Sequence, residues 1–546
     1  MTIPAVVDAS CGVEKAGLIE TSEMSAQLLE GVETTNEAKD STSTLVRSGR
    51  SSTENTTAGN SCEDLQSKGN VDQEKAFKED PTSDLPVDLI TVPPKHGNKL
   101  TRYLEHNFFS YYRKIFVVIF FANISALIAF TVENNGTPLL TEIGAATSAN
   151  LMVALLFRQE NFVNLVYEIC TCVPHSFPLW IRRRLAKVFH YGGCHSGCGT
   201  AAIFWYILYT ITATRDYVLS PSRAQLANVS TSYILVLMFI FILGGAHPKF
   251  RVRYHDYFEV VHRFAGWVAL VTFWVHTIFA ASVAAHDANT TIGLILVASP
   301  NFWFICISTS CTILSWSRLR QHDVYPEFLS SHAIRLHFKY KNMPPFYGLK
   351  VSTNPALEWH AFATIPNPPP PKPLGAGAAG DRPGFSIVVS NAGDWTSKAI
   401  SAPPSKLWIR GSPLHGLLYT SLLFKHVVLI ATGSGIGPCL SLLYANRTPR
   451  RIFWSASHPE STYGDGIVQA VKKADEKCVI WDTKKKGRPD IVREVWKLVA
   501  ESRESAGKEG GGAEAVFIIS NPKVTRKVVY GMESRGVAAY GAIFDS

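Results

Sequence analysis

Six long apolar runs with almost no charge constrain this chain more than any other feature of its sequence. They lie near residues 115–132, 139–157, 200–219, 229–246, 260–285 and 291–314. A helix needs about 20 predominantly apolar residues to cross the hydrocarbon core of a bilayer. A single run could be a buried helix of a soluble protein, but six runs within 200 residues indicate a multi-pass membrane bundle. The second run is the most dilute, because it contains Glu142.

The basic residues in the short connections predict the orientation of this bundle. They concentrate before the first run and after the second, fourth and sixth runs, as with Arg113, Arg183 and Arg251. The opposite connections hold only Arg215 and Arg223. By the positive-inside rule, we expect both termini to face the cytosol. The membrane is expected to be the plasma membrane or an endomembrane. N-x-S/T sequons on the predicted outer side add glycosylation as an expectation. They are Asn135, Asn228 and Asn289.

The charge is divided unevenly along the chain. The formal net charge of +9 combines −9 in the first 95 residues, where 8 residues are basic and 17 acidic, with +18 in the rest. Residues 1–95 contain one aromatic residue, Phe77, so they have too little apolar surface to fold and are predicted to be a disordered acidic tail. Met1–Pro4 begins neither a basic nor an apolar signal region, so no signal peptide is expected. We assign the basic excess to cytosolic loops and anionic cofactors rather than to nucleic acid, and Lys484–Lys486 to a solvated turn.

Two histidines in the fifth run are candidate metal ligands. His262 and His276 are fourteen residues apart, which in a helix is about 21 Å and nearly four full turns, so they share one face. This spacing suits two stacked haems, since haem iron accepts imidazole ligands. The alternative is a pair of histidines that hydrogen-bond to neighbouring helices.

The partner ligands are less evident. His190 and His195 lie at the cytosolic start of the third run, at the depth of His262, so an inner haem b is possible there. The outer histidine, His276, has no second imidazole, because positions 204 and 209 hold Phe and Tyr. The C-x-x-x-C pattern around His195 is only a weak metal signature.

Beyond residue 330 the chain has short β-rich runs and then alternating strand and helix patterns. The apolar stretch Val427–Thr432 precedes a glycine-rich loop, and residues 439–444 are predicted to be helical. A strand, a glycine loop and a helix in this order suit a pyrophosphate, because the helix start offers free N–H groups. Further strands near residues 451–457, 478–483 and 515–520 complete a predicted parallel sheet. The loop residues are Gly433, Ser434, Gly435, Ile436, Gly437 and Pro438.

Several motifs together resemble one superfamily. His360–Thr364 is similar to an H-P-F-[ST] flavin motif, with Ala361 in place of Pro, and Gly393–Thr396 to G-[GD]-W-T. Gly433–Pro438 is similar to G-[ST]-G-I-x-P, and Gly487–Asp490 to G-R-P-[DN]. Over residues 105–546 the chain resembles the ferric reductase and NADPH oxidase superfamily, and within it the fungal TmpA-type integral membrane flavoproteins.

This resemblance implies a six-helix membrane domain over residues 96–320, an FAD-binding β-barrel of ferredoxin reductase type over 321–420, and an NAD(P)-binding α/β domain over 421–546. It also implies roles for single residues. The flavin ring and phosphate would be contacted by His360, Phe362 and Thr364, and the flavin pyrophosphate would be covered by Trp395 and Thr396. Arg488 would bind the nicotinamide nucleotide, and Phe544 would shield the flavin ring. Ser520 stands where the family has a cysteine beside the hydride path.

The expected cofactors are FAD and NADPH, with haem b as an option. NADPH is favoured over NADH because Trp454–His458, after the second strand, holds no carboxylate for the ribose, and Arg488 can pair with a 2'-phosphate. The predicted function is electron transfer from NADPH through FAD to an acceptor that the residues do not identify. The resemblance places this in fungal development or specialised metabolism. The alternative is a regulatory membrane protein that keeps the fold without catalysis, and a transporter would leave the nucleotide motifs unexplained.

Overall fold

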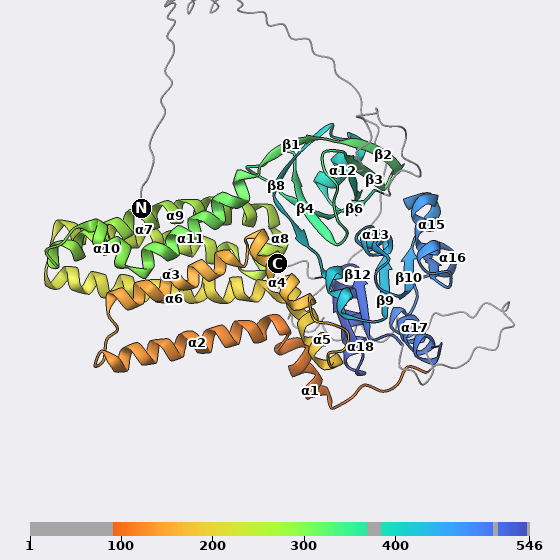
Figure 1. Ribbon diagram of the computed structural model, residues 1–546, viewed down its shortest axis with the longest axis horizontal. Coiled ribbons are helices and arrows are strands. Elements are labelled where there is room, and N and C mark those ends of the chain that lie inside the picture. The colour runs from red at the N-terminus through yellow and green to blue at the C-terminus, as the bar shows by residue number, and fades with distance from the viewer. Residues whose placement is uncertain (1–90, 368–383, 506–511, 543–546) are drawn as a thin grey trace, which may run out of the picture. The chain divides into compact units, whose positions relative to one another are not determined.

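The computed structural model describes residues 91–367, 384–505 and 512–542, all within one compact unit that spans residues 87–546. In chain order, helices are followed by antiparallel strands and then by alternating strands and helices (Figure 1). The first 90 residues of the predicted acidic tail, the Pro- and Gly-rich stretch 368–380 and Phe544 lie outside the described residues.

Helices form at all six apolar runs. Asn98 caps the first helix by accepting a hydrogen bond from the Thr101 N–H, as short polar side chains do at helix starts. The helices of this region are α1 (Lys99–Tyr103), the π-helix η1 (Leu104–Phe108), α2 (Tyr111–Glu133), α3 (Leu140–Leu156), α4 (Glu160–Thr171), α5 (Leu179–Leu185), the 3-10 helix η2 (Ala186–His190), α6 (Gly192–Leu219), α7 (Arg223–Gly245), α8 (Pro248–Arg253), α9 (His255–Asp287), α10 (Ile292–Ala298) and α11 (Pro300–Ser317).

Among the described helices, fewer than six have the length and the apolar composition of a membrane span. Among the described residues, α2, α7 and α9 are long and apolar enough, and the number rises to five if α3 with α4, and α10 with α11, each count as one bent span. The helix α6, although 28 residues long, is not among them. The helical positions are therefore confirmed, whereas a six-span membrane bundle stays a prediction.

The sixth predicted run is not one continuous helix. The helices α10 and α11 meet at a bend of 75°, and Ser299 between them has an extended backbone. The cause is Pro300, which has no N–H to continue the ladder and disfavours a helical conformation at the residue before it. A second bend of 75° separates α3 from α4, where the Gln159 side chain caps the new helix at the Phe162 N–H.

Amide side chains join the helices of the bundle. Asn123 on α2 and Asn150 on α3 exchange hydrogen bonds of 3.2 and 2.7 Å, and the Trp205 indole on α6 donates to Asn123. Asn228 is buried on α7 and donates to the Tyr209 hydroxyl, so the expectation of a glycan at Asn228 is wrong for the folded chain. Asn135 and Asn289 are exposed in left-handed turns.

The antiparallel strands that follow form two sheets around one apolar core. One sheet has the order β1-β8-β4-β5 and the other β2-β3-β7-β6. Residues of both, such as Leu336, Val351 and Ile409, belong to a single buried cluster, as expected of a small barrel. Its elements are β1 (Arg320–Asp323), β2 (Tyr325–Ser330), β3 (Ala333–Phe338), β4 (Tyr347–Ser352), β5 (His360–Ala363), β6 (Ile365–Pro366), β7 (Phe385–Ser390), helix α12 (Asp394–Ser401), β8 (Lys406–His415) and the 3-10 helix η3 (Leu417–Leu423).

The last part of the chain is a parallel five-stranded sheet of order β11-β10-β9-β12-β13. In chain order this is 3-2-1-4-5, the arrangement of dinucleotide-binding folds. The predicted strands are confirmed, and β13, which the sequence reasoning missed, forms the edge beside β12. The elements are β9 (Val427–Thr432), the turn η4 (Gly433–Gly435), α13 (Ile436–Ala445), β10 (Arg450–Ala456), α14 (Pro459–Tyr463), α15 (Asp465–Ala474), β11 (Val479–Asp482), α16 (Thr483–Lys486), α17 (Ile491–Ser505), β12 (Ala515–Ile519), α18 (Pro522–Glu533) and β13 (Ala538–Gly541).

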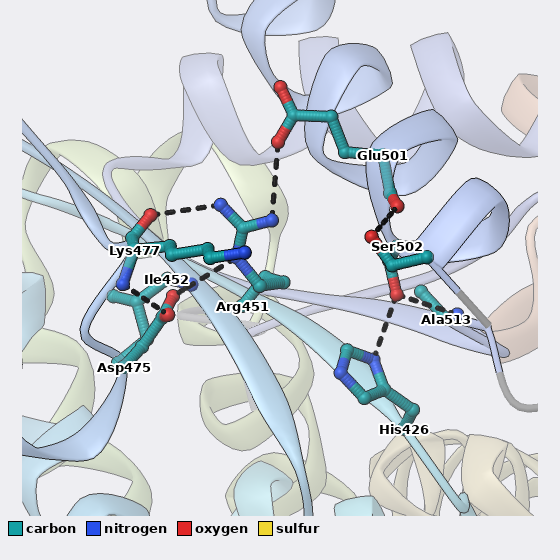
Figure 2. A network of polar contacts seen from close by, with 9 residues as sticks. His426, Arg451, Ile452, Asp475, Lys477, Glu501, Ser502 and Ala513 are labelled. Carbon is teal, nitrogen blue, oxygen red and sulfur yellow. Dashed lines mark hydrogen bonds and ion pairs between the residues drawn. The ribbon is translucent and has the colours of Figure 1, made fainter.

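Polar contacts fix the amino-terminal side of this sheet. Figure 2 shows Arg451 of β10 between the carboxylates of Asp475 and Glu501, at 3.4 and 3.2 Å. The Ser502 hydroxyl bridges the His426 ring and the Ala513 N–H. The network ties α17 to the beginnings of β9, β10 and β12, away from the carboxyl ends of the strands.

Residues 160–190, which we call the connecting segment, link the helical bundle to both later parts. The Asn164 side chain on α4 bonds the backbone of β8 at Pro413 and His415. Val163 and Phe189 share a buried cluster with residues of β9, β12 and β13. The core of the nucleotide sheet is therefore completed by a segment from the helical region.

Candidate functional site

The glycine loop lies at the carboxyl end of β9, where the sequence predicted it. Gly433–Gly435 form the turn η4, and α13 starts at Ile436. A Cβ on Gly435 would lie 2.1 Å from the Ile519 carbonyl oxygen of β12, so only glycine allows this close approach of the two strand ends. Ser434 is exposed beside it. The loop thus presents backbone N–H groups at a helix start, as a pyrophosphate requires.

Ser520 stands at the end of β12, beside this loop. Its buried hydroxyl lies 2.5 Å from the Thr432 hydroxyl at the end of β9. Asn521 caps α18 by accepting from the Val524 N–H. The structure thus places Ser520 at the carboxyl edge of the sheet, where a nicotinamide would bind. The other predicted catalytic residue, Phe544, lies outside the described residues.

The two flavin motifs meet in the barrel. The His360 ring stacks on the Trp395 indole with centroids 4.3 Å apart, and Phe362 lies 5.9 Å from the same indole. The Thr396 hydroxyl accepts hydrogen bonds from the N–H groups of Ala392 and Gly393 and so shapes the start of α12. The backbone N–H groups of the first turn of this helix have no intrahelical acceptor.

Thr364 has a different place from the one predicted. It is fully buried, and its hydroxyl donates to the Tyr347 carbonyl at 2.9 Å. Because that hydroxyl already has an acceptor in the core, Thr364 holds β4 in this structure and does not face a ligand. The helix α13 packs on β5 and β6, and Gly437 lies against Val388 of β7. The flavin motifs and the glycine loop are therefore on neighbouring elements.

One carboxylate near the nucleotide loop was missed by the sequence reasoning. Asp482 ends β11, the strand next to β10, and accepts hydrogen bonds from the N–H groups of His458 and Lys484 at 3.1 and 2.9 Å. Although desolvation acts to raise the pKa of Asp482, these N–H groups outweigh it and hold the pKa below its ordinary value. Its position near the end of the strand predicted at residues 478–483 was the sequence signal that could have revealed it, and in the sheet it lies opposite Ala456. Arg488 is exposed nearby.

One pair of histidines in the bundle faces each other. The rings of His195 on α6 and His262 on α9 have centroids 6.1 Å apart. The His195 Nδ1 donates to the Ala154 carbonyl at 2.9 Å, which leaves its Nε2 as a free acceptor. Gly199 and Gly266, one turn further along each helix, border open space. These features fit one haem between His195 and His262.

His190 and His276 do not join such a pair. His190 packs against Phe189 and Tyr111 instead of facing His262. His276 is buried against Tyr209, at 5.1 Å, and its Nδ1 lies 3.1 Å from the Thr231 hydroxyl. Tyr206 and Tyr209 stack on each other where an outer haem would lie. The predicted ligand roles of His190 and His276 therefore do not fit this structure, because aromatic side chains fill the space.

One family model matches the part of the chain that holds the parallel sheet and the glycine loop. Residues 417–546 match the family model for the C-terminal domain of adenylate-forming reductase 03009. The match contains the whole parallel sheet, from before β9 to beyond β13.

Two curated relatives extend this similarity into the helical region. Adenylate-forming reductase 03009 of Coprinopsis cinerea is 41% identical over 454 residues, which are 83% of this chain and 42% of that protein. Adenylate-forming reductase 06235 of the same fungus is 39% identical over 457 residues, with the same two coverages. This chain therefore spans less than half the length of these relatives. The resemblance to ferric reductases, NADPH oxidases and TmpA-type flavoproteins stays a prediction.

Solved structures were also compared. Ferredoxin-NADP+ reductase from Plasmodium falciparum with 2'P-AMP is 12% identical, with a TM-score of 0.29, over 41% of this chain and 96% of that one. The Amycolatopsis cytochrome P450 reductase GcoB is 11% identical, also with a TM-score of 0.29, over 42% of this chain and 71% of that one.

Proposed function

We propose that this chain is a membrane-bound oxidoreductase that takes electrons from NADPH through FAD to an acceptor. The observation that carries the proposal is the position of the Gly433–Pro438 loop at the carboxyl end of the central strand of a 3-2-1-4-5 sheet, next to a barrel that holds the stacked pair His360 and Trp395. The reductase names of the two curated relatives support it.

The residues present fit a flavin nucleotide. Trp395 and Phe362 offer aromatic faces, and the N–H groups at the start of α12 suit a pyrophosphate. When bound, FAD supplies hydride acceptance and one-electron release. The protein's own part is orientation: Gly435 lets the loop approach β12, and the Thr432 hydroxyl fixes Ser520 beside it. Arg488 supplies a positive charge for a 2'-phosphate, and the Oδ1 of Asp482 already accepts hydrogen bonds from the N–H groups of His458 and Lys484.

The test is an anaerobic absorption spectrum of the full chain, purified in detergent with FAD added. We expect flavin bands that NADPH bleaches. Arg488→Ala should weaken NADPH binding about tenfold while binding of NADH is unchanged. Arg493→Ala, an exposed arginine on α17, is the matched control and should behave as wild type. A chain that binds no flavin would contradict the proposal and favour the regulatory alternative.

We propose further that one haem is held by His195 and His262. His262→Ala and His195→Ala should each remove the Soret band of the purified chain, whereas His276→Ala and His190→Ala should keep it. The reason is that only the first pair has two imidazoles facing each other. Loss of the band in His276→Ala alone, or a wild-type chain without any Soret band after supplementation with haemin, would refute this assignment.

A further inference from the structure

Cationic side chains gather where the inner end of the bundle meets the barrel. Lys350 on β4 and Arg410 on β8 stand directly opposite each other in the antiparallel register. Arg158 lies in the turn between α3 and α4. The positive charges of Arg410 and Arg158 repel that of Lys350, and the charge of Arg263 on α9 repels that of Arg410. Like charges opposite each other on paired strands repel, so this arrangement is unfavourable without an anion.

The protein's own carboxylates do not balance these cations. Glu259 pairs with Arg263 at 3.1 Å, and Glu160 accepts a hydrogen bond from the Ser315 hydroxyl at 2.6 Å. Lys350, Arg410 and the charged groups that act on these two comprise four cations and two carboxylates, a net charge of +2. In the part of the chain that the structure describes, the side chains of Arg158, Lys350 and Arg410 have no hydrogen-bonded or ion-paired partner.

Arg410 is held rigidly for binding. Its guanidinium carbon lies 4.7 Å from the ring centroids of both Trp316 and Trp359. Two indole faces fix the plane of the guanidinium and leave its N–H edge as the only place for an acceptor. The Nε of Arg410 is buried without one. A guanidinium that is fixed in this way loses little conformational entropy when it binds a phosphate with its N–H fork.

Lys350 and Arg158 complete the arrangement from two sides. Both side chains keep accessible surface, so a ligand can reach them. Desolvation by the surrounding protein, together with Arg410 and Arg158, lowers the pKa of Lys350 to about 8. The amine therefore remains mostly protonated at pH 7, and a bound anion would stabilise that charge.

We propose that Arg158, Lys350 and Arg410 form a binding site for a dianionic phosphate group, which is either the head group of an anionic lipid or a soluble phosphate ester. The net charge of +2 matches a phosphate monoester. The site is distinct from the flavin motif: Lys350 pairs with Ala361, whereas His360 and Phe362 pair with Val351 and Leu349, so their side chains point to the other face of the sheet. The proposal does not depend on flavin binding.

The experiment titrates inorganic phosphate into the full chain in phosphatidylcholine nanodiscs, with heat as the readout. Wild type should bind it saturably. Lys350→Met and Arg410→Gln should each weaken binding about tenfold or more, the loss expected for one charged hydrogen bond. Lys341→Met, which removes an exposed lysine in the loop between β3 and β4, removes the same charge elsewhere and should bind as wild type.

A second arm identifies the source of the phosphate. Wild type and Lys350→Met are extracted from vesicles of phosphatidylcholine and phosphatidic acid, and their bound lipid is analysed. Phosphatidic acid enriched on wild type alone identifies a lipid, and phosphate binding without that enrichment identifies a soluble ester. The site does not exist if wild type shows neither, or if both variants bind phosphate as wild type does. Lys350 is exposed, so its variant should melt at the wild-type temperature even if Arg410→Gln fails to fold.

Discussion

Gly435→Ala is expected to weaken binding of nicotinamide nucleotide by this chain roughly 100-fold. Gly435 has an ordinary helical backbone, so its conformational freedom is not the reason for the effect. The added Cβ would meet the Ile519 carbonyl oxygen at 2.1 Å and its carbon at 2.9 Å. Both are backbone atoms of a buried strand that cannot move aside. Overpacking of this kind costs about 3 kcal/mol, which corresponds to roughly 100-fold in affinity.

The measurement is the dissociation constant of NADP+ by calorimetry, together with the melting temperature of the chain. Gly466→Ala is the matched control, because Gly466 lies in α15 with nothing within 4 Å of an added Cβ. That variant should bind as wild type and be slightly more stable, since alanine favours a helix by about 1 kcal/mol over glycine. Equal nucleotide affinity in both variants would mean that the loop does not need its contact with β12.

Arg182→Met is expected to release the connecting segment from the nucleotide domain. Arg182 is buried, and its Nη1 and Nη2 donate to the two carboxylate oxygens of Glu514 at 2.7 and 2.9 Å. Nη1 also donates to the Leu423 carbonyl at 2.7 Å. Removing one partner of a buried pair costs about 3–5 kcal/mol, and the loss should lie at the lower end of this range because the half-buried Glu514 keeps the hydrogen bond from the Lys425 N–H. The readouts are a lower melting temperature and faster proteolysis within residues 160–190.

The control for this prediction is the double variant Arg182→Met with Glu514→Leu. It removes both charges, so most of the lost stability should return. If the single variant is as stable as wild type, the ion pair does not hold the segment in place.

The ion pair between Arg182 and Glu514 also makes the stability of the docked segment depend on pH. Desolvation acts to raise the pKa of Glu514, but the hydrogen bond from Arg182 and the Lys425 N–H outweigh it, so the pKa is lowered in the folded chain. A carboxylate with a lowered folded pKa adds stability above its unfolded value, about 4.3, and that contribution disappears as the pH falls further. Docking of the segment in wild type should therefore weaken below about pH 4, and this dependence should be absent in the double variant.

The sequence predicted most elements of the fold, because their signals are local. The run Val427–Thr432 is apolar up to its last residue, as expected of a strand covered on both faces, and β9 has the same bounds. The predictions failed where a distant contact or a single residue overrides the pattern. Pro300 breaks the sixth run, and α4 leaves the direction of α3 because its polar side chains bond β8. Asn164 and Pro413 are 249 residues apart, whereas Pro300 lies within the sixth run itself.

In the candidate sites, too, local features were predictable from the sequence and features that depend on distant contacts were not. The Gly433–Pro438 loop was predictable, because glycine spacing after a strand has one main use. The choice of His195 over His190 was not, since both lie at the same depth and only packing against Tyr111 turns His190 away. Arg410 had no signal at all: its importance depends on Trp316 and Trp359, which come from a helix and a loop far apart in sequence.

The connecting segment also has a consequence for how this protein is made. Phe189 is buried in a cluster with residues of β9, β12 and β13, and its ring lies 6.3 Å from that of Tyr540 on β13, while β12 begins at Ala515. A ribosome that adds roughly 5–20 residues per second needs about 15–65 seconds to travel from the end of the segment to that strand. During this interval Phe189 lacks these neighbours on the nascent chain. Biosynthesis therefore includes a waiting period in which the end of the connecting segment is open to chaperones and proteases.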